Sequence, residues 1–303
     1  MTAAPGLAAP LAAALRPVAD GPGLPGFERG WLGGPAPAAY LDYLAGDDAF
    51  NWSEELEDLH ENEGADHFLD EWTRRAVLDG LDLARSAHPL IVDIGCSSGV
   101  LLRDLRREQP GAALLGVDVV PSGLRVAHGV VPDVPLIRAS ALALPLADGS
   151  IDAIASLNVL EHLAEDVGAL AEMHRVLRPG GRAAVVVPAG PGLYDFYDRH
   201  LQHERRYARG ELSKKAASTG LRVRLDTHLG SGLYPAFWVV KKRNRRRQRS
   251  LEPARERELV AGQIEGTKSS RVGRALCALE RRALARGVRP PVGIRSLVVV
   301  ERP

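Results

Sequence analysis

The sequence predicts an α/β protein built on a doubly wound, mostly parallel sheet of seven strands. Two observations favour this fold class. From residue 90 to residue 227, short apolar and β-branched runs alternate with amphipathic stretches of helical periodicity, which is typical of consecutive strand–helix units. A nearly continuous apolar run at residues 294–301 adds a closing strand. A chain of 303 residues is long enough for one large domain with a substantial core and additional segments.

Each expected element follows from its local pattern. Helical spacing of apolar residues predicts helices such as 100–108 and 163–177, within a main domain at 89–303. The residues between the last two strands, 230–290, are neither periodic nor core-like, and an inserted lid is expected there. The expected strands are 90–94, 113–118, 134–138, 151–156, 182–187, 221–227 and 294–301.

Two segments precede this domain. Residues 1–37 contain 7 Pro and 7 Gly. Such a composition buries too little apolar surface to offset the entropy of ordering, so a largely disordered Ala/Pro/Gly-rich tail is expected. Residues 38–88 are expected to form an N-terminal helical extension of two helices. One lies around Trp52, with Ser53 as its N-cap, and the second lies around Trp72.

Composition excludes several classes of protein. Lys and Arg number 39 against 38 Asp and Glu, a net charge of +1, which is too weak a field for nucleic-acid binding through overall charge. No apolar run is long enough to span a membrane. The two cysteines, Cys96 and Cys277, form no CxxC pair, so neither a disulfide framework nor a cysteine zinc site is expected. Pro10 interrupts the only apolar run near the start, so no signal peptide and a cytoplasmic location are predicted.

A glycine-containing turn joins the first strand to the helix after it, with the sequence Asp93-Ile-Gly95-Cys-Ser-Ser-Gly99. Gly95 lets the backbone turn and a ligand approach closely, and Gly99 lets helix and strand pack tightly. Because Asp93 would repel a phosphate, the turn suits a zwitterionic amino-acid group better than a pyrophosphate. Asp118 ends the next strand, where an acidic residue accepts hydrogen bonds from two ribose hydroxyls.

This turn resembles the first motif of the class I S-adenosylmethionine-dependent methyltransferases, in a methyltransferase type 11-like domain. Four later segments are similar to further motifs of that family and occur in the same order: 116–118, 141–152, 158–163 and 175–181. A single motif of this kind is weak, whereas the ordered set is specific. The resemblance implies a Rossmann-like methyltransferase fold with S-adenosyl-L-methionine as cofactor.

The resemblance also implies which residues bind this cofactor. Ser140 stands where the family commonly has Asp beside the adenine, and its hydroxyl is a neutral, weaker acceptor. The side chain of Cys96 is itself expected to be a small buried apolar group. The expected cofactor-binding residues are Asp93, Gly95, Cys96, Gly99, Asp118, Val119, Ser140, Ala141 and Asn158.

The acceptor site is expected over the carboxyl ends of the fourth and fifth strands, with His203 and His162 as candidate catalytic residues. A histidine with a near-neutral pKa suits a general base. The alternatives are that His203 and Arg206 only brace their loop and that His162 packs at a helix start. Some quinone-pathway O-methyltransferases carry metal ligands in a similar stretch, but Asn158 stands where they have an additional Glu. No metal site is therefore predicted.

One part of the insertion is strongly basic. Trp238 precedes a run from Lys241 to Arg249 with seven basic residues in nine. An aromatic residue beside clustered cations is typical of peripheral contact with an anionic membrane surface, and a solvated charge run is the alternative reading. No aromatic interleaving supports nucleic-acid binding.

The sequence thus predicts methyl transfer from S-adenosylmethionine to a small-molecule acceptor, namely a secondary metabolite, a sugar or a lipid-linked glycan. Two alternatives stay open. A nicotinamide-dependent oxidoreductase is disfavoured by the G-x-x-x-G spacing of Gly95 and Gly99, since dinucleotide binders use G-x-G-x-x-G. A catalytically silent S-adenosylmethionine-binding protein is disfavoured by the intact Asp93 and Asp118.

Overall fold

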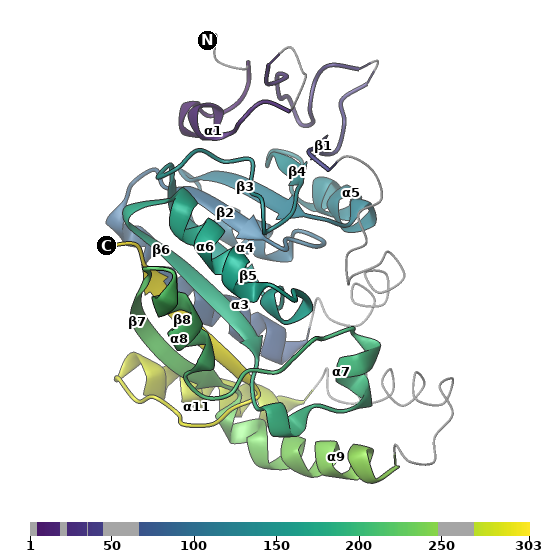
Figure 1. Cartoon of the computed structure of the whole chain (residues 1–303), viewed down its shortest axis with the longest axis vertical. Coiled ribbons are helices and arrows are strands. Elements are labelled where there is room, and N and C mark those ends of the chain that lie inside the picture. The colour runs from purple at the N-terminus through teal and green to yellow at the C-terminus, as the bar shows by residue number, and fades with distance from the viewer. Residues whose placement is uncertain (1–4, 19–22, 35, 45–66, 248–269) are drawn as a thin grey trace.

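The computed structural model describes residues 5–18, 23–34, 36–44, 67–247 and 270–303 and centres on one sheet (Figure 1). Its strands are β1 (Leu41–Asp42), β2 (Leu90–Ile94), β3 (Ala113–Asp118), β4 (Leu136–Arg138), β5 (Ile151–Leu157), β6 (Leu177–Pro188), β7 (Arg222–Leu229) and β8 (Arg295–Glu301). They lie in the order β1-β4-β3-β2-β5-β6-β8-β7. All neighbouring strands are parallel except β8, which pairs antiparallel with both β6 and β7.

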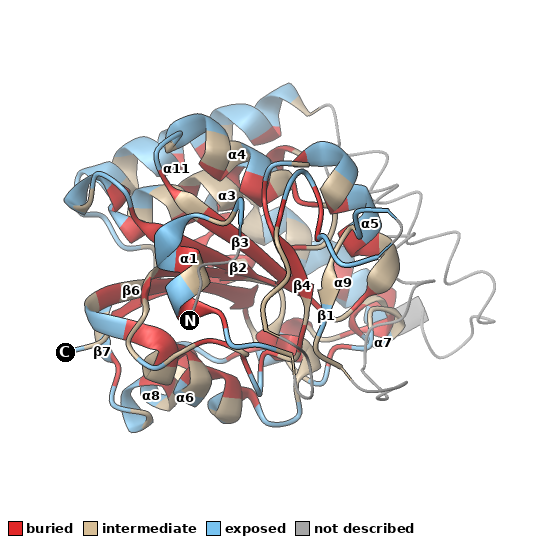
Figure 2. Cartoon of the chain, turned by 90° about the horizontal axis from the view of Figure 1, so that it is seen from above, coloured by how far each residue is buried: buried red, intermediate tan, exposed pale blue. Residues whose placement is uncertain are grey.

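Helices cover both faces of the sheet (Figure 2). The helices are α1 (Ala9–Ala14), α3 (Phe68–Leu81), α4 (Val100–Glu108), α5 (Pro121–Val130), α6 (Asp166–Val176), α7 (Phe196–His200), α8 (Glu211–Ser218), α9 (Tyr234–Arg247) and α11 (Arg271–Ala285). One apolar core lies between the sheet and α3, α4, α5 and α11. The second lies on the opposite face, against α1, α6 and α8. The predicted α/β fold class is confirmed, with eight strands rather than seven because β1 adds a short edge strand.

The prediction of a disordered tail is wrong for the described residues of segment 1–37. They form α1 and an irregular segment that packs against β3 and β4. Trp31 is 2% exposed, and its indole Nε1 donates to the carbonyl of Leu136 at 2.7 Å. Phe27 packs edge-on against Trp31, and Leu11 is also buried. The prediction from composition is wrong here because a few large apolar side chains anchor a segment that is otherwise rich in Pro and Gly.

The described residues of the extension at 38–88 are only partly helical. It supplies β1, which pairs with β4, and then α3. Trp72 is buried on α3, as the helical spacing predicted. The helix expected around Trp52 and Ser53 lies outside the described residues.

The insertion at 230–290 has more regular structure than the sequence suggested. It contains α9 and the amphipathic α11, with Cys277 and Glu280 buried on the latter. The Glu280 carboxylate accepts hydrogen bonds from Trp72 Nε1 and from the amides of Gly230 and Ser231, all at 2.9 Å. This residue therefore ties α11 to α3 and fixes the turn from which α9 begins. A lid function for the insertion stays a prediction.

Candidate functional site

The sequence-predicted cofactor residues gather along one edge of the sheet. Asp93 and Asp118 lie at the carboxyl ends of β2 and β3, while Ser140 and Asn158 follow the ends of β4 and β5. These four strands are parallel neighbours, so their carboxyl ends share that edge. From β2 the chain proceeds outward to β3 and β4, and from β5 it proceeds the other way to β6. Such a topological switch point is where open α/β sheets bind ligands.

The turn after β2 needs both of its glycines for packing. Gly95 and Gly99 each have φ of +77°, which favours glycine, and Gly99 is the N-cap of α4. A Cβ on Gly95 would lie 2.2 Å from Cγ2 of Val159, and one on Gly99 would lie 3.0 Å from Cβ of Ala127. The sequence analysis predicted that a ligand approaches Gly95 closely. In the structure, the side chain of Val159 already lies close to Gly95.

Asp118 holds this turn and the next helix in place. Its Oδ2 accepts the amide of Ser97 at 2.8 Å, and its Oδ1 accepts the amides of Val119 and Val120 at 2.7 and 2.9 Å. Val120 is the N-cap of α5. Three backbone donors keep a carboxylate at the strand end, where the sequence analysis placed the ribose contact.

Asp93 is buried with an unused acceptor. The residue is 2% exposed, and Oδ2 has no hydrogen-bond partner among the described residues. Burial, with a smaller contribution from the charge of Asp118, raises the pKa of Asp93 to about 8. An ammonium group would supply both the missing donor and the missing positive charge. The side chain therefore fits the amino-acid end of S-adenosylmethionine.

The remaining predicted cofactor residues differ in what they offer. The side chain of Cys96 packs in the apolar core, as expected, so only its backbone faces the turn. Ser140 Oγ accepts the amide of Leu142 at 3.1 Å, and this bond orders the start of the loop after β4. Asn158 has φ of +54°. Val119 and Ala141 complete the set beside β3 and β4, the former half-buried and the latter buried.

The two candidate catalytic histidines come together from distant parts of the sequence. His162 ends a single 3-10 turn after β5, at Leu160–His162, and His203 lies in the loop after α7. Their rings meet edge-on with centroids 4.8 Å apart. The amide of Glu204 donates to the carbonyl of Glu161 at 2.8 Å, which holds the two segments side by side.

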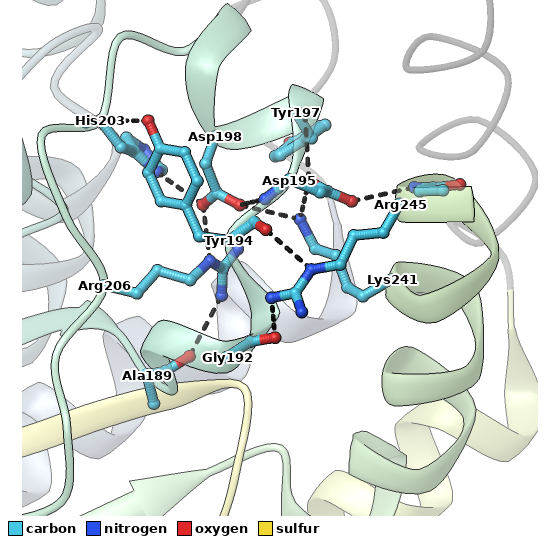
Figure 3. Close-up of polar contacts among 11 residues, drawn as sticks. Ala189, Gly192, Tyr194, Asp195, Tyr197, Asp198, His203, Arg206, Lys241 and Arg245 are labelled. Atoms are coloured by element: carbon cyan, nitrogen blue, oxygen red, sulfur yellow. Dashed lines mark hydrogen bonds and ion pairs between the residues drawn. The ribbon is translucent and has the colours of Figure 1, made fainter. Parts of the chain in front are cut away.

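Asp198, which sequence reasoning did not single out, organises the polar cluster around His203 (Figure 3). Its Oδ1 lies 3.0 Å from Nδ1 of His203 and accepts from Nε of Arg206 at 2.6 Å. Its Oδ2 accepts from Nζ of Lys241 at 3.1 Å, and Asp195 accepts from the same Nζ at 2.6 Å. Asp195 and Asp198 also form a capping box at the start of α7. The D-x-x-D spacing was the available sequence signal.

The cluster controls protonation at His203. Burial alone would raise the pKa of Asp198, but the hydrogen bond from His203 and the charges of Arg206 and Lys241 hold it well below its usual range. Burial lowers the pKa of His203, against the opposing effect of Asp198. At neutral pH His203 is therefore a neutral imidazole. Because Nδ1 donates to Asp198, the lone pair is on Nε2.

The structure corrects the reading of the basic run 241–249 for Lys241 alone. Arg249 lies outside the described residues, and membrane contact through Trp238 and the rest of the run stays a prediction. Lys241 is 4% exposed and paired with two carboxylates, so it belongs neither to a solvated charge run nor to a membrane-facing surface. Trp238, Lys242 and Arg243 are exposed on the same helix, and the ammonium of Lys242 lies 4.5 Å from the Trp238 ring centroid. Within the described part of the chain, no helix is both long and apolar enough to cross a bilayer.

The comparisons with known proteins agree with this geometry. Residues 92–185 match the family model described as a methyltransferase domain. The demethylmenaquinone methyltransferase of Thermus thermophilus is 38% identical over 120 residues, which cover 38% of this chain and 53% of that protein. The same enzyme of Beutenbergia cavernae is 36% identical, over 43% of this chain and 55% of that protein. The chain thus spans about half the length of these curated relatives.

The solved structures show the same fold. Geranyl diphosphate C-methyltransferase from Streptomyces coelicolor, in complex with Mg²⁺, geranyl diphosphate and S-adenosyl-L-homocysteine, superposes with a TM-score of 0.51 at 16% identity. The match covers 77% of this chain and 79% of that one. Residues 92–185 thus match a methyltransferase domain in sequence, and the chain shares the fold of this solved methyltransferase. The resemblance to the class I S-adenosylmethionine-dependent methyltransferases is confirmed.

Proposed function

We propose that this protein transfers a methyl group from S-adenosylmethionine to a small-molecule acceptor. The acceptor class is that expected from the sequence, namely a secondary metabolite, a sugar or a lipid-linked glycan. The observation that carries the proposal is the pair of carboxylates at the switch point. Asp118 is held at the end of β3 by backbone donors, and Asp93 is buried nearby with Oδ2 unpartnered. A cofactor with an ammonium group at one end and a ribose in its middle satisfies both residues.

The cofactor residues have distinct tasks in this scheme. Asp93 accepts from the ammonium group, Asp118 accepts from the ribose hydroxyls, and the loop beginning at Ser140 borders the adenine. S-adenosylmethionine supplies a methyl group that is already electrophilic because it is bound to a sulfonium. The chain therefore has to position the acceptor and, for a hydroxyl or an ammonium, accommodate loss of a proton.

The acceptor site is proposed beyond the ends of β5 and β6. His162 and His203 meet there, and His203 is backed by Asp198 in the manner of a carboxylate that orients a general base. The neutral Nε2 of His203 is suited to accept a proton from the acceptor. The relatives named demethylmenaquinone methyltransferase make quinols a sensible first group of acceptors to test.

Calorimetric titration separates the candidate functions. The proposal expects S-adenosylhomocysteine and S-adenosylmethionine to bind and NAD not to bind. The reverse pattern would establish the oxidoreductase alternative. Methyl transfer from labelled S-adenosylmethionine to members of an acceptor panel then tests activity. Binding of the cofactor without transfer to any acceptor would favour a catalytically silent protein.

A further inference from the structure

A second set of polar groups lies beside the cofactor edge and is not needed to bind the cofactor. Glu161 is fully buried, and neither of its carboxylate oxygens has a hydrogen-bond partner among the described residues. Burying an ionisable carboxyl group without any partner is costly. The buried carboxyl group of Glu161 in the proposed acceptor site would therefore be stabilised by a hydrogen-bond donor or a cation.

Two histidines stand next to this carboxylate. One potential ligand atom from each of Glu161, His162 and His203 lies within 4.8 Å of the other two. The first two residues come from the turn after β5, and the third comes from the loop after α7. The Glu204 amide bond to the carbonyl of Glu161 holds these two segments together. The cluster is therefore a product of the fold rather than of one sequence motif.

The environment of His203 provides a separate indication. Metal-binding histidines usually donate their second ring N–H to a carboxylate, which fixes the tautomer and strengthens the ligand. Asp198 occupies that position, 3.0 Å from Nδ1 of His203, and is itself fixed by Arg206 and Lys241. The Nε2 lone pair of His203 is thereby available to a metal ion.

We propose that Glu161, His162 and His203 form a binding site for a divalent transition-metal ion, with Asp198 as the outer carboxylate that orients His203. Two imidazoles and one carboxylate favour ions such as Zn²⁺, Mn²⁺ or Fe²⁺ over Mg²⁺ and Ca²⁺, which prefer oxygen ligands. Three protein ligands also leave coordination positions open for an acceptor. The sequence analysis did not predict this metal site, because Asn158 stands where some quinone-pathway O-methyltransferases have an additional Glu. The sequence spacing also gave no sign that His203 lies close enough to Glu161 and His162 to be a third ligand.

The site would define the chemical class of the acceptor, an inference that rests on the proposed methyl transfer. An acceptor hydroxyl that coordinates the ion loses its proton to solvent, because a bound divalent cation lowers the pKa of such a group. The oxygen then bonds to the methyl carbon while the carbon–sulfur bond breaks. The sulfonium leaves as the neutral thioether S-adenosylhomocysteine. In this scheme His203 is a ligand rather than the base.

Metal content gives a test that does not depend on activity. The full chain is treated with a chelator, dialysed against ZnCl₂, MnCl₂ or MgCl₂ in turn, and its bound metal is measured by mass spectrometry. We expect about one Zn²⁺ or Mn²⁺ per chain and no retained Mg²⁺. Glu161→Gln and His203→Gln should each abolish retention. Asp198→Asn should weaken binding roughly 10- to 100-fold.

His228→Gln is the matched control, because His228 is also a buried histidine but lies on β7. Its metal content should equal that of the wild type. Glu161→Gln preserves shape, so the test remains decisive even if His203→Gln fails to fold. Absence of retained metal in the wild type, or equal retention in Glu161→Gln, would overturn the proposal. Turnover that persists in the chelated enzyme but is lost in His203→Gln would also overturn it and identify His203 as a metal-free base.

The test separates failure of the metal site from failure of the proposed function. Binding of S-adenosylhomocysteine depends on Asp93 and Asp118, which are not among the proposed ligands. A chain that binds this compound but no metal contradicts only the metal site. A chain that binds metal but neither S-adenosylhomocysteine nor S-adenosylmethionine contradicts the methyltransferase function and, with it, the assignment of the acceptor.

Discussion

Binding of the cofactor should release nearly one proton from Asp93 at neutral pH. Burial raises the pKa of this carboxyl group to about 8, so about nine tenths of the unliganded chains hold it protonated at pH 7. An ammonium group placed at the unpartnered Oδ2 favours the ionised form and lowers the pKa again. If the bound pKa falls to about 5 or below, roughly 0.9 proton is released per cofactor bound.

Calorimetry measures this number directly. S-adenosylhomocysteine is titrated into the protein at pH 7 in several buffers that differ in ionisation enthalpy, and the dependence of the observed enthalpy on that quantity counts the protons. Asp93→Asn, which keeps the shape of the side chain, should reduce the release to near zero. Glu161→Gln is the matched control and should leave it unchanged. An observed enthalpy independent of buffer in the wild type, or equal proton release in Asp93→Asn, would refute the reasoning.

Three further substitutions test how the site is built. Asp118→Asn should lower affinity for S-adenosylhomocysteine at least ~10-fold and also lower the melting temperature, because the carboxylate accepts three backbone amides. An unchanged melting temperature would show that these bonds do not stabilise the turn. Gly95→Ala should destabilise the protein, since its Cβ would lie 2.2 Å from Val159, and adding Val159→Ala should restore part of the loss. A full loss in the double variant would place the strain in the backbone instead. Lys241→Met should cost roughly 3–5 kcal/mol in denaturant unfolding, because two buried carboxylates lose their shared cation. A loss below ~1 kcal/mol, typical of an exposed pair, would contradict this.

Sequence reasoning succeeded where local pattern decides structure. The strands at Leu90–Ile94 and Ala113–Asp118 and the helix at Val100–Glu108 have the predicted bounds. Short apolar runs that are rich in β-branched residues and bounded by turn residues are typical of strands with both faces buried. The positions of Asp93 and Asp118 also follow from the strand pattern. Each residue lies at the carboxyl end of a predicted strand, and parallel neighbouring strands bring these ends to one edge of the sheet.

The failures share a different cause, since each depends on a contact between segments far apart in the sequence. Trp31 anchors a Pro- and Gly-rich segment by donating a hydrogen bond from its indole to the carbonyl of Leu136. Lys241 looked like a surface charge because its carboxylate partners come from around α7, more than forty residues earlier. Part of the stabilising role of Asp118 also depends on such a contact, since one of its three amide donors is on Ser97. Contacts between such distant residues cannot be predicted from composition or from the spacing of residues.

The unliganded protein should lose stability as pH rises from 6.5 to 8. The pKa values of Asp93 and Glu161 are both raised to about 8 by burial, far above the values of these groups in an unfolded chain. Over this range the unfolded state has already lost both protons while the folded state still holds them. The folded state thus binds more protons, and stability falls with pH, by roughly 1–2 kcal/mol for each group.

His203 and His228, whose pKa values are lowered by burial, give the opposite slope, but only below about pH 6.5. Urea unfolding at pH 6.5 and 8 should therefore show the loss, and Asp93→Asn and Glu161→Gln should each remove about half of it. If stability is constant over this range, these carboxyl groups are ionised in the folded chain, and the proton release expected from Asp93 on cofactor binding cannot occur.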